Sequence, residues 1–382
     1  MVGTNMMRFL IKPEQLNIDN TILINEKALA IILKNKVQLI LDIYDSDEGN
    51  TDKSIIVFIH GNSTSKKVFK DQIEYFSKDY RVIAFDLLGH GESSKICDID
   101  ISEKDKDILA ENFYNPLAMI AQVKQLLKYK NINKAHFVGW SLGGHIAYGI
   151  GVDTPELIKS ITTIASPPVE FSTEGFKKGF YEFFTNDLIP QWINSPTREI
   201  ENVEATAEYN GYSDINGKDQ FFIEDLKISD PKMRKFLFLG MDQSKNKILD
   251  GEKFVKMTKL PICLMIGEYD SGTRVEYILK FRSTLGNKIL RNTILQVHVI
   301  KDAKHAVFRT NNNEFINILS HFIKTVNTMK NKKLPGTSSW KKTAVKFGIT
   351  AAATAGLLFM SYKIFKGNSL TKDTVSSNKL ML

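Results

Sequence analysis

The sequence predicts an α/β protein: a mostly parallel, doubly wound sheet with a helical cap inserted into it and a hydrophobic helix near the C-terminus. Two observations predict the sheet. Short, continuously apolar runs typical of strands buried on both faces recur along the chain, and segments with apolar residues at helical spacing separate them. A third observation predicts the cap, because aromatic residues are frequent over residues 169–257 and no buried strand is expected there.

Strands and helices alternate through the first part of the chain. Residues 21–45 alternate irregularly between apolar and polar side chains, which predicts the two strands of an edge hairpin. Helices are expected at residues 68–76 and 116–130, where apolar side chains fall on one face. Buried strands, separated by these helices, are expected over residues 54–59, 81–85, 135–138 and 158–164. Such alternation is typical of βαβ units.

The same alternation resumes after the insertion, with strands expected over residues 262–266 and 293–300 and helices over 275–285 and 314–326. The core is therefore assigned to residues 20–168 and 258–330, on either side of the cap at 169–257. A basic linker, an apolar helix and a polar tail are expected to follow, over residues 331–342, 343–365 and 366–382.

The net charge of +8 comes from the C-terminal region. Ten of the 51 basic residues and one of the 43 acidic residues lie after Met329, which leaves 41 basic and 42 acidic side chains for the rest. A nearly neutral globular part gives no support for a nucleic-acid-binding protein, which is expected to carry a basic face.

The two cysteines, Cys97 and Cys263, have no metal-ligand spacing and predict no disulfide framework. The first 13 residues lack an apolar stretch of signal-peptide length, so export is not expected.

The segment Gly139-Trp-Ser-Leu-Gly143 carries the strongest functional signal. It follows a predicted buried strand directly and opens a predicted helix at Leu142. In this context Gly-x-Ser-x-Gly describes a nucleophile elbow, a strained turn that presents a serine hydroxyl above the edge of the sheet. Side chains at Gly139 and Gly143 would clash with the neighbouring strand and helix. We therefore expect Ser141 to be a nucleophile; the alternative is that the glycines only permit tight packing.

A second glycine-containing turn, His60-Gly-Asn62, follows the strand at 54–59. A backbone N–H here can face the same crevice as the elbow, so the N–H groups of Asn62 and Leu142 are the expected oxyanion hole. An ordinary turn is the alternative reading of the His-Gly pair. Asp86 and His90 lie in the loop after the next strand, where we expect them to organise the loop rather than to catalyse.

A serine nucleophile needs a base and an orienting carboxylate. His305 is the expected base, since it lies in the loop after the last strand, at the sheet edge where open α/β sheets bind ligands. Asp270 is the expected carboxylate; Glu268 lies closer to the strand end, and Asp302 is only three residues before His305. The other histidines fall in motif loops, strands or helices that do not face the hydroxyl: His60, His90, His136, His145, His298 and His321.

Together these elements resemble the α/β-hydrolase superfamily over about residues 20–330. The run His60-Gly-Asn-Ser-Thr-Ser65, followed by Val68-Phe69, resembles a group of bacterial cap-bearing esterases and lipases. The resemblance implies that the first oxyanion donor follows the His-Gly pair, at Asn62. Lys304 departs from the family pattern, in which glycine usually precedes the catalytic histidine. The order expected of this fold is the one found here: Ser141, Asp270, His305.

The resemblance implies a serine hydrolase that cleaves a small-molecule or lipid ester and needs no metal or organic cofactor. Related dehalogenases and epoxide hydrolases have aspartate at the nucleophile position, and Ser141 argues against both. Carboxylesterases, lipases, thioesterases, enol-lactonases and carbon–carbon hydrolases stay open, as does a non-catalytic binding protein that retains the fold. No oligomeric state is predicted.

The C-terminal region predicts contact with a membrane. Residues 347–362 contain no charged side chain, and Trp340 and Tyr362 suit the two interfaces of a bilayer. We therefore expect residues 343–365 to span a membrane or to lie on one. The lysines before this segment predict a cytoplasmic catalytic domain; the alternative is a soluble cytoplasmic protein.

Deletion of the residues after Leu334 is expected to release the protein from membranes, because the apolar segment and its basic flank are removed. Fractionation of cells that express the full-length or the shortened chain measures this. Recovery of the full-length chain in the soluble fraction without detergent would contradict the anchor.

Overall fold

An eight-stranded sheet forms the centre of the protein, in the order β1-β4-β6-β5-β7-β8-β9-β10. The computed structural model describes residues 6–18, 21–49, 52–194, 203–214, 216–241, 249–290 and 294–329. β1 and β4 pair antiparallel at one edge, and every pairing from β6 to β10 is parallel. The strands are Met6–Leu10 (β1), Ile40–Asp45 (β4), Ile55–Ile59 (β5), Arg81–Phe85 (β6), Ala135–Trp140 (β7), Ile158–Ile164 (β8), Ile262–Gly267 (β9) and Leu295–Ile300 (β10). The predicted α/β class, its mostly parallel sheet and its six predicted core strands are confirmed, with β10 half-buried over most of its length.

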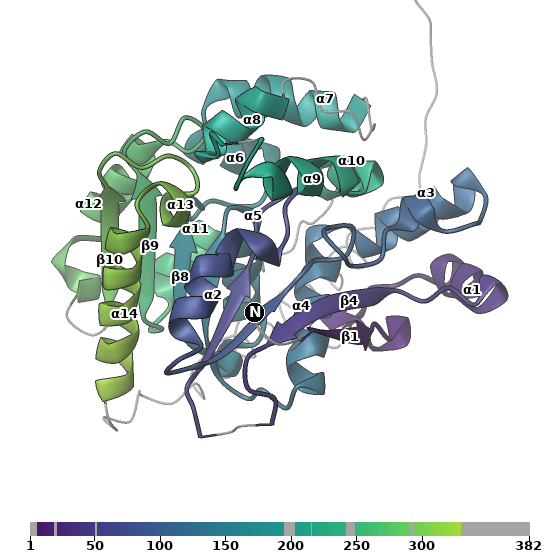
Figure 1. Ribbon diagram of the computed structural model, residues 1–382, viewed down its shortest axis with the longest axis horizontal. Helices are drawn as coiled ribbons and strands as arrows, with labels where there is room; N and C mark the ends of the chain where they lie inside the picture. The colour runs from purple at the N-terminus through teal and green to yellow at the C-terminus, as the bar shows by residue number, and fades with distance from the viewer. Residues whose placement is uncertain are drawn as a thin grey trace, which may run out of the picture. The chain divides into compact units, whose positions relative to one another are not determined.

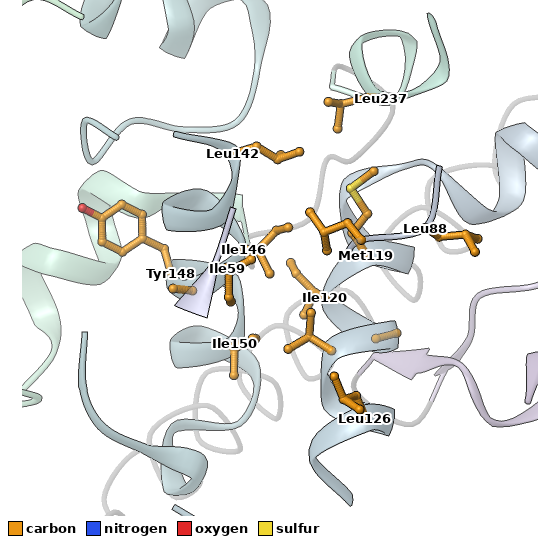
Figure 2. Packing of buried hydrophobic residues seen from close by; sticks show 14 of the residues in the cluster. Ile59, Leu88, Met119, Ile120, Leu126, Leu142, Ile146, Tyr148, Ile150 and Leu237 are labelled. Carbon is orange, nitrogen blue, oxygen red and sulfur yellow. The ribbon is translucent and has the colours of Figure 1, made fainter. Parts of the chain in front are cut away.

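Helices cover both faces of this sheet (Figure 1). On one face α2 (Lys70–Phe76) and α14 (Asn312–Thr328) bury aromatic and aliphatic side chains against the strands. On the other face the buried cluster joins α4 (Pro116–Tyr129) and α5 (Leu142–Asp153) to the strands. Figure 2 shows this second cluster, in which side chains of α5 face side chains of α4: Ile146, Ile150, Met119 and Ile120. The core also contains α3 (Glu103–Phe113), α12 (Val275–Leu290) and α13 (Val307–Thr310).

The predicted edge hairpin over residues 21–45 is wrong. A short strand, β3 (Thr21–Ile22), pairs with β2 (Asn17–Ile18), and the helix α1 (Glu26–Asn35) follows before β4. Three local features favour the helix. The Asn25 side chain caps it by accepting a hydrogen bond from Ala28 N at 2.9 Å, Ala28 and Ile32 are buried one turn apart, and Lys36 ends it with φ of 52°. β4 pairs antiparallel with β6 on its inner side and with β1 on its outer side, and β1 comes from a segment in which the sequence predicts no strand.

The insertion between β8 and β9 is helical, as expected. Its described parts are α6 (Thr173–Gly179), the π-helical turn η5 (Phe183–Leu188), α7 (Ile189–Asn194), α8 (Val203–Asn210), α9 (Gln220–Ile228), α10 (Pro231–Leu239) and α11 (Gly251–Met257). Helices α6 to α10 gather at one end of the sheet (Figure 1). The start of the insertion pairs with the residue before α11 in an isolated antiparallel bridge, Glu170 with Asp250. Cap and core belong to one compact unit that ends at Met329.

The C-terminal expectations fall on residues that the structure does not describe. The predicted basic linker (331–342), apolar helix (343–365) and polar tail (366–382) all lie beyond Met329, the last described residue. Within the described ranges no helix combines the length and the hydropathy needed to cross a membrane.

Candidate active site

Ser141 occupies the turn between β7 and α5, as the sequence predicts. Its backbone has φ of 51° and ψ of −115°, a conformation that L-residues rarely adopt and that is typical of a nucleophile elbow. The Ser141 N–H donates to Ile164 O at 2.9 Å, which holds the turn against the end of β8. The hydroxyl therefore sits at the N-terminus of α5, where the helix dipole gives a positive potential.

Two glycines allow this turn. A Cβ on Gly139 would lie 2.3 Å from the carbonyl oxygen of Gly143, and a Cβ on Gly143 would lie 2.1 Å from the carbonyl oxygen of Ile59. The first turn of α5 thus packs directly on the end of β5, with no side chain between the two backbones. This close approach brings Leu142 N next to the loop that follows β5.

Both expected oxyanion donors lie at this contact. Leu142 is the first residue of α5, and Asn62 follows the His60-Gly pair at the end of β5. Among the hydrogen bonds recorded for the described residues, neither backbone N–H donates to an acceptor in the protein. These two N–H groups therefore stay the expected donors to a substrate oxygen.

His305 and Asp270 are brought together from 35 residues apart. His305 Nδ1 lies 3.0 Å from Asp270 Oδ2 and 3.1 Å from Oδ1. Oδ1 also accepts from the backbone N–H groups of Gly272 (2.9 Å) and Thr273 (3.0 Å), so the carboxylate is held in place. Asp270 and His305 are each only 4% exposed to solvent. With Nδ1 donating to Asp270, the other ring nitrogen is the one that can accept a proton.

The competing carboxylates lie elsewhere. Glu268 is exposed, and its Oε2 accepts from Asp302 N at 3.3 Å. Asp302 is itself exposed, in a turn with φ of 53°. The structure therefore joins His305 to Asp270 and to neither of the two alternatives.

Ser141 is linked to His305 through its neighbour Trp140. The indole Nε1 of Trp140 donates to the His305 carbonyl at 3.1 Å, and the two rings are 5.7 Å apart. No hydrogen bond from the Ser141 hydroxyl is recorded within the described part of the chain. The structure thus bonds Asp270 to His305, and it joins the residue before Ser141 to the backbone of His305.

Tyr209, on cap helix α8, is a contact that sequence reasoning missed. Its ring stacks on the His305 imidazole, with centroids 4.7 Å apart and planes at 27°. The aromatic-rich cap could be read from the sequence, but the one ring that reaches the imidazole depends on how α8 packs. Trp140 and Tyr209 together enclose the imidazole in the apolar surroundings of two rings.

His60 and Asp86, in the motif loops after β5 and β6, have structural partners. His60 Nε2 accepts from Leu87 N at 2.9 Å and its Nδ1 donates to Gly61 O at 2.7 Å; burial lowers the pKa of this imidazole to about 4. Asp86 accepts from the backbone N–H of Lys66 (2.7 Å) and from its ammonium (2.8 Å), as expected of a loop organiser. Among the described residues, no group of three or more His, Cys, Asp or Glu side chains is arranged to hold a metal ion.

Gly143→Ala is expected to destabilise the fold by about 1–3 kcal/mol and to displace the start of α5, because its methyl group meets the Ile59 carbonyl. Gly240→Ala is the control, since the nearest atom to an added Cβ there is at 3.1 Å. Urea unfolding of both variants measures the difference; equal stabilities would contradict the close approach.

His145 provides a test by pH. Burial against Phe171 and Phe176 lowers the pKa of its imidazole to about 3. As the pH falls through 6.5, unfolded chains bind a proton at this position and folded chains do not. The free energy of unfolding therefore decreases as the pH decreases. Between pH 7 and 5, His145→Phe is expected to lose about 2 kcal/mol less stability than the wild type. Urea unfolding at both pH values measures the two slopes, and equal slopes would refute the prediction.

Comparison with known proteins places this geometry in a family. A model described as the alpha/beta hydrolase fold matches residues 54–311, about two thirds of the chain. The chain is 26% identical over 285 residues to a pimeloyl-[acyl-carrier protein] methyl ester esterase of Aliivibrio fischeri (strain MJ11), covering 74% of this chain and 97% of the esterase. It is 25% identical over 242 residues to the bifunctional esterase/perhydrolase DCH of Acinetobacter calcoaceticus, covering 60% and 79% of the two chains.

Solved structures agree in fold. The N-acyl homoserine lactonase AidH, complexed with N-butanoyl homoserine, superposes with a TM-score of 0.60 at 22% identity, covering 77% of this chain and 96% of the lactonase. A thermophilic esterase from Thermogutta terrifontis superposes with a TM-score of 0.56 at 17% identity, covering 76% and 94%.

Proposed function

The chain belongs to the alpha/beta hydrolase family and is a hydrolase, and we propose that it cleaves a carboxylic ester through an acyl-enzyme on Ser141. The observation that carries the proposal is the pair of contacts between His305 Nδ1 and the Asp270 carboxylate, made beside the turn that bears Ser141. Esterases among the relatives support an ester as the substrate.

In the first step, the second ring nitrogen of His305, Nε2, takes the proton from the Ser141 hydroxyl, and the oxygen attacks the ester carbonyl carbon. The negative charge that develops on the carbonyl oxygen is stabilised by the N–H groups of Asn62 and Leu142. Each such donor typically contributes about 10²–10³ in rate. Asp270 keeps the imidazole in the required tautomer and stabilises its charged form.

In the second step, the tetrahedral intermediate collapses and the leaving alcohol takes the proton from His305 Nε2. The acyl group is now bonded to Ser141. Water then attacks the acyl carbon, gives its proton to His305, and the carboxylic acid leaves as Ser141 regains its proton. No step needs a group beyond these side chains, the two amides and water.

The apolar side of the cap supports an acyl chain as the part of the substrate that is recognised. His145, one helical turn after Ser141, stacks on Phe176 at 5.3 Å, and Phe176 stacks on Phe180 at 4.6 Å. Phe184 continues the row at 5.0 Å from Phe180. The rings of Phe176 and Phe180 are buried next to the helix that Ser141 precedes, and such apolar surroundings favour apolar acyl groups over charged ones. A lipid-derived ester fits this description.

A fluorophosphonate probe tests the proposal. The wild type is expected to be labelled covalently, and Ser141→Ala is expected to lose the label while it keeps its far-UV circular dichroism. His305→Gln is expected to lower kcat by about 10³-fold or more on p-nitrophenyl esters. A panel of acyl lengths then defines the preferred chain. A folded wild type that is neither labelled nor active would contradict the proposal and would favour a binding protein.

A further inference from the structure

We infer that Arg234, on cap helix α10, is a positioning residue that holds the loop carrying the oxyanion donor Asn62. The inference rests on the proposed function, because it concerns how one donor of that site is kept in place. It makes the oxyanion hole dependent on a side chain of the cap rather than on the core alone.

The loop after Asn62 needs support from outside. Ser63 has φ of 58°, in the left-handed region that non-glycine residues disfavour. Within the loop, the Ser63 hydroxyl donates to Asn62 Oδ1 at 3.3 Å and the Thr64 hydroxyl donates to Gly61 O at 3.1 Å. The longer of these bonds is a weak one, and a strained residue persists only where its surroundings hold it.

Arg234 supplies that support. Its Nε donates to Ser63 Oγ at 2.8 Å, and its terminal nitrogen donates to Leu226 O, in α9, at 2.5 Å. Arg234 is 2% exposed and Ser63 is 4% exposed, so water does not compete for this contact. One guanidinium thus connects the strained residue beside Asn62 to two helices of the cap.

A second cap residue holds the other side of the same loop. The Ser65 hydroxyl donates to Asp225 Oδ2 at 2.5 Å, and both residues are fully buried. Burial raises the pKa of Asp225 to about 7, although the Ser65 hydrogen bond acts to lower it. The loop is therefore held on both sides of Thr64, by α10 at Ser63 and by α9 at Ser65.

The chemistry of the two cap residues indicates more than packing. Burial lowers the pKa of Arg234 to about 10, against the effect of Asp230, and the guanidinium still carries its charge at neutral pH. A buried charge is costly to fold and is a poor way to anchor a helix. Its fork of fixed N–H groups is, however, well suited to holding an oxygen atom at a defined position. Oxyanion donors need that accuracy, because their effect depends on reaching the oxygen at about 3 Å.

The decisive variant is Arg234→Met, which keeps an unbranched side chain about as long as the aliphatic stem of arginine and removes the guanidinium donors. Lys232→Met is the matched control on the same helix, because Lys232 ties α10 to α3 through Glu103 (3.0 Å) and Asp107 (2.5 Å) without touching the loop. Each protein is assayed on two substrates that share acyl chain and leaving group: an ester and the thionoester with C=S in place of C=O. Sulfur accepts hydrogen bonds weakly, so the rate of thionoester hydrolysis depends little on the oxyanion hole.

Arg234→Met is expected to lower kcat on the ester by about 10–100-fold with KM nearly unchanged, and to lower kcat on the thionoester by less than about 3-fold. Arg234→Lys is expected to recover part of the loss, since an ammonium can donate to Ser63 Oγ. Lys232→Met is expected to change neither substrate by more than about 2-fold. Equal losses on both substrates, or no loss on the ester, would overturn the inference.

Amide hydrogen exchange separates this inference from the proposed function. Peptides that cover residues 60–69 are expected to exchange faster in Arg234→Met than in the wild type, and at the wild-type rate in Lys232→Met. If the wild type hydrolyses neither substrate, the proposed function falls, and the exchange result still decides whether Arg234 holds the loop. Unchanged exchange in Arg234→Met would overturn the inference even in an active esterase.

Discussion

The backbone of α5 passes so close to the end of β5 that position 143 has room for a hydrogen atom and nothing larger. This one approach determines how the candidate site is built. It sets the N-terminus of α5, with Ser141 and the Leu142 amide, against the loop that begins at His60. Parallel strands then bring the loops after β9 and β10, and with them Asp270 and His305, to the same edge of the sheet. The rest of the site is built around a contact between two main chains.

The cap reaches this edge on two sides. Its helices α9 and α10 hold the loop after β5, while the end of α8 lies on the loop that bears His305. There Tyr209 covers the imidazole, Asn210 O accepts from Ala306 N at 3.3 Å, and Glu208 forms an ion pair with Lys304. Beneath this cover His305 is only 4% exposed. The geometry of the candidate site therefore depends on how the cap packs on the core.

Local patterns predicted much of this, and long-range packing accounts for the remainder. The buried strands can be predicted because continuous apolar runs identify them. The elbow can be predicted because the spacing of its glycines indicates a close contact between two backbones. Asp270 could be preferred over Glu268 from its distance to the strand end alone. Helix α1 is not predicted from the sequence. Its local signals, Asn25 as a cap and two buried apolar residues one turn apart, occupy few residues within a longer stretch where apolar and polar side chains alternate. Arg234 and Tyr209 had no sequence signal, because their partners lie 171 and 96 residues away.

The bridge between Glu170 and Asp250 has a consequence for how such proteins diversify. Around it, Phe171 N donates to Leu249 O at 2.8 Å and Gly251 N donates to Val169 O at 3.1 Å, so the chain leaves the core and returns to it at a single point. The length of the segment between these two residues is therefore not fixed by the sheet. A segment of another length could leave and return at the same point, but it would have to supply again the contacts that Arg234, Asp225 and Tyr209 make with the loops of the site.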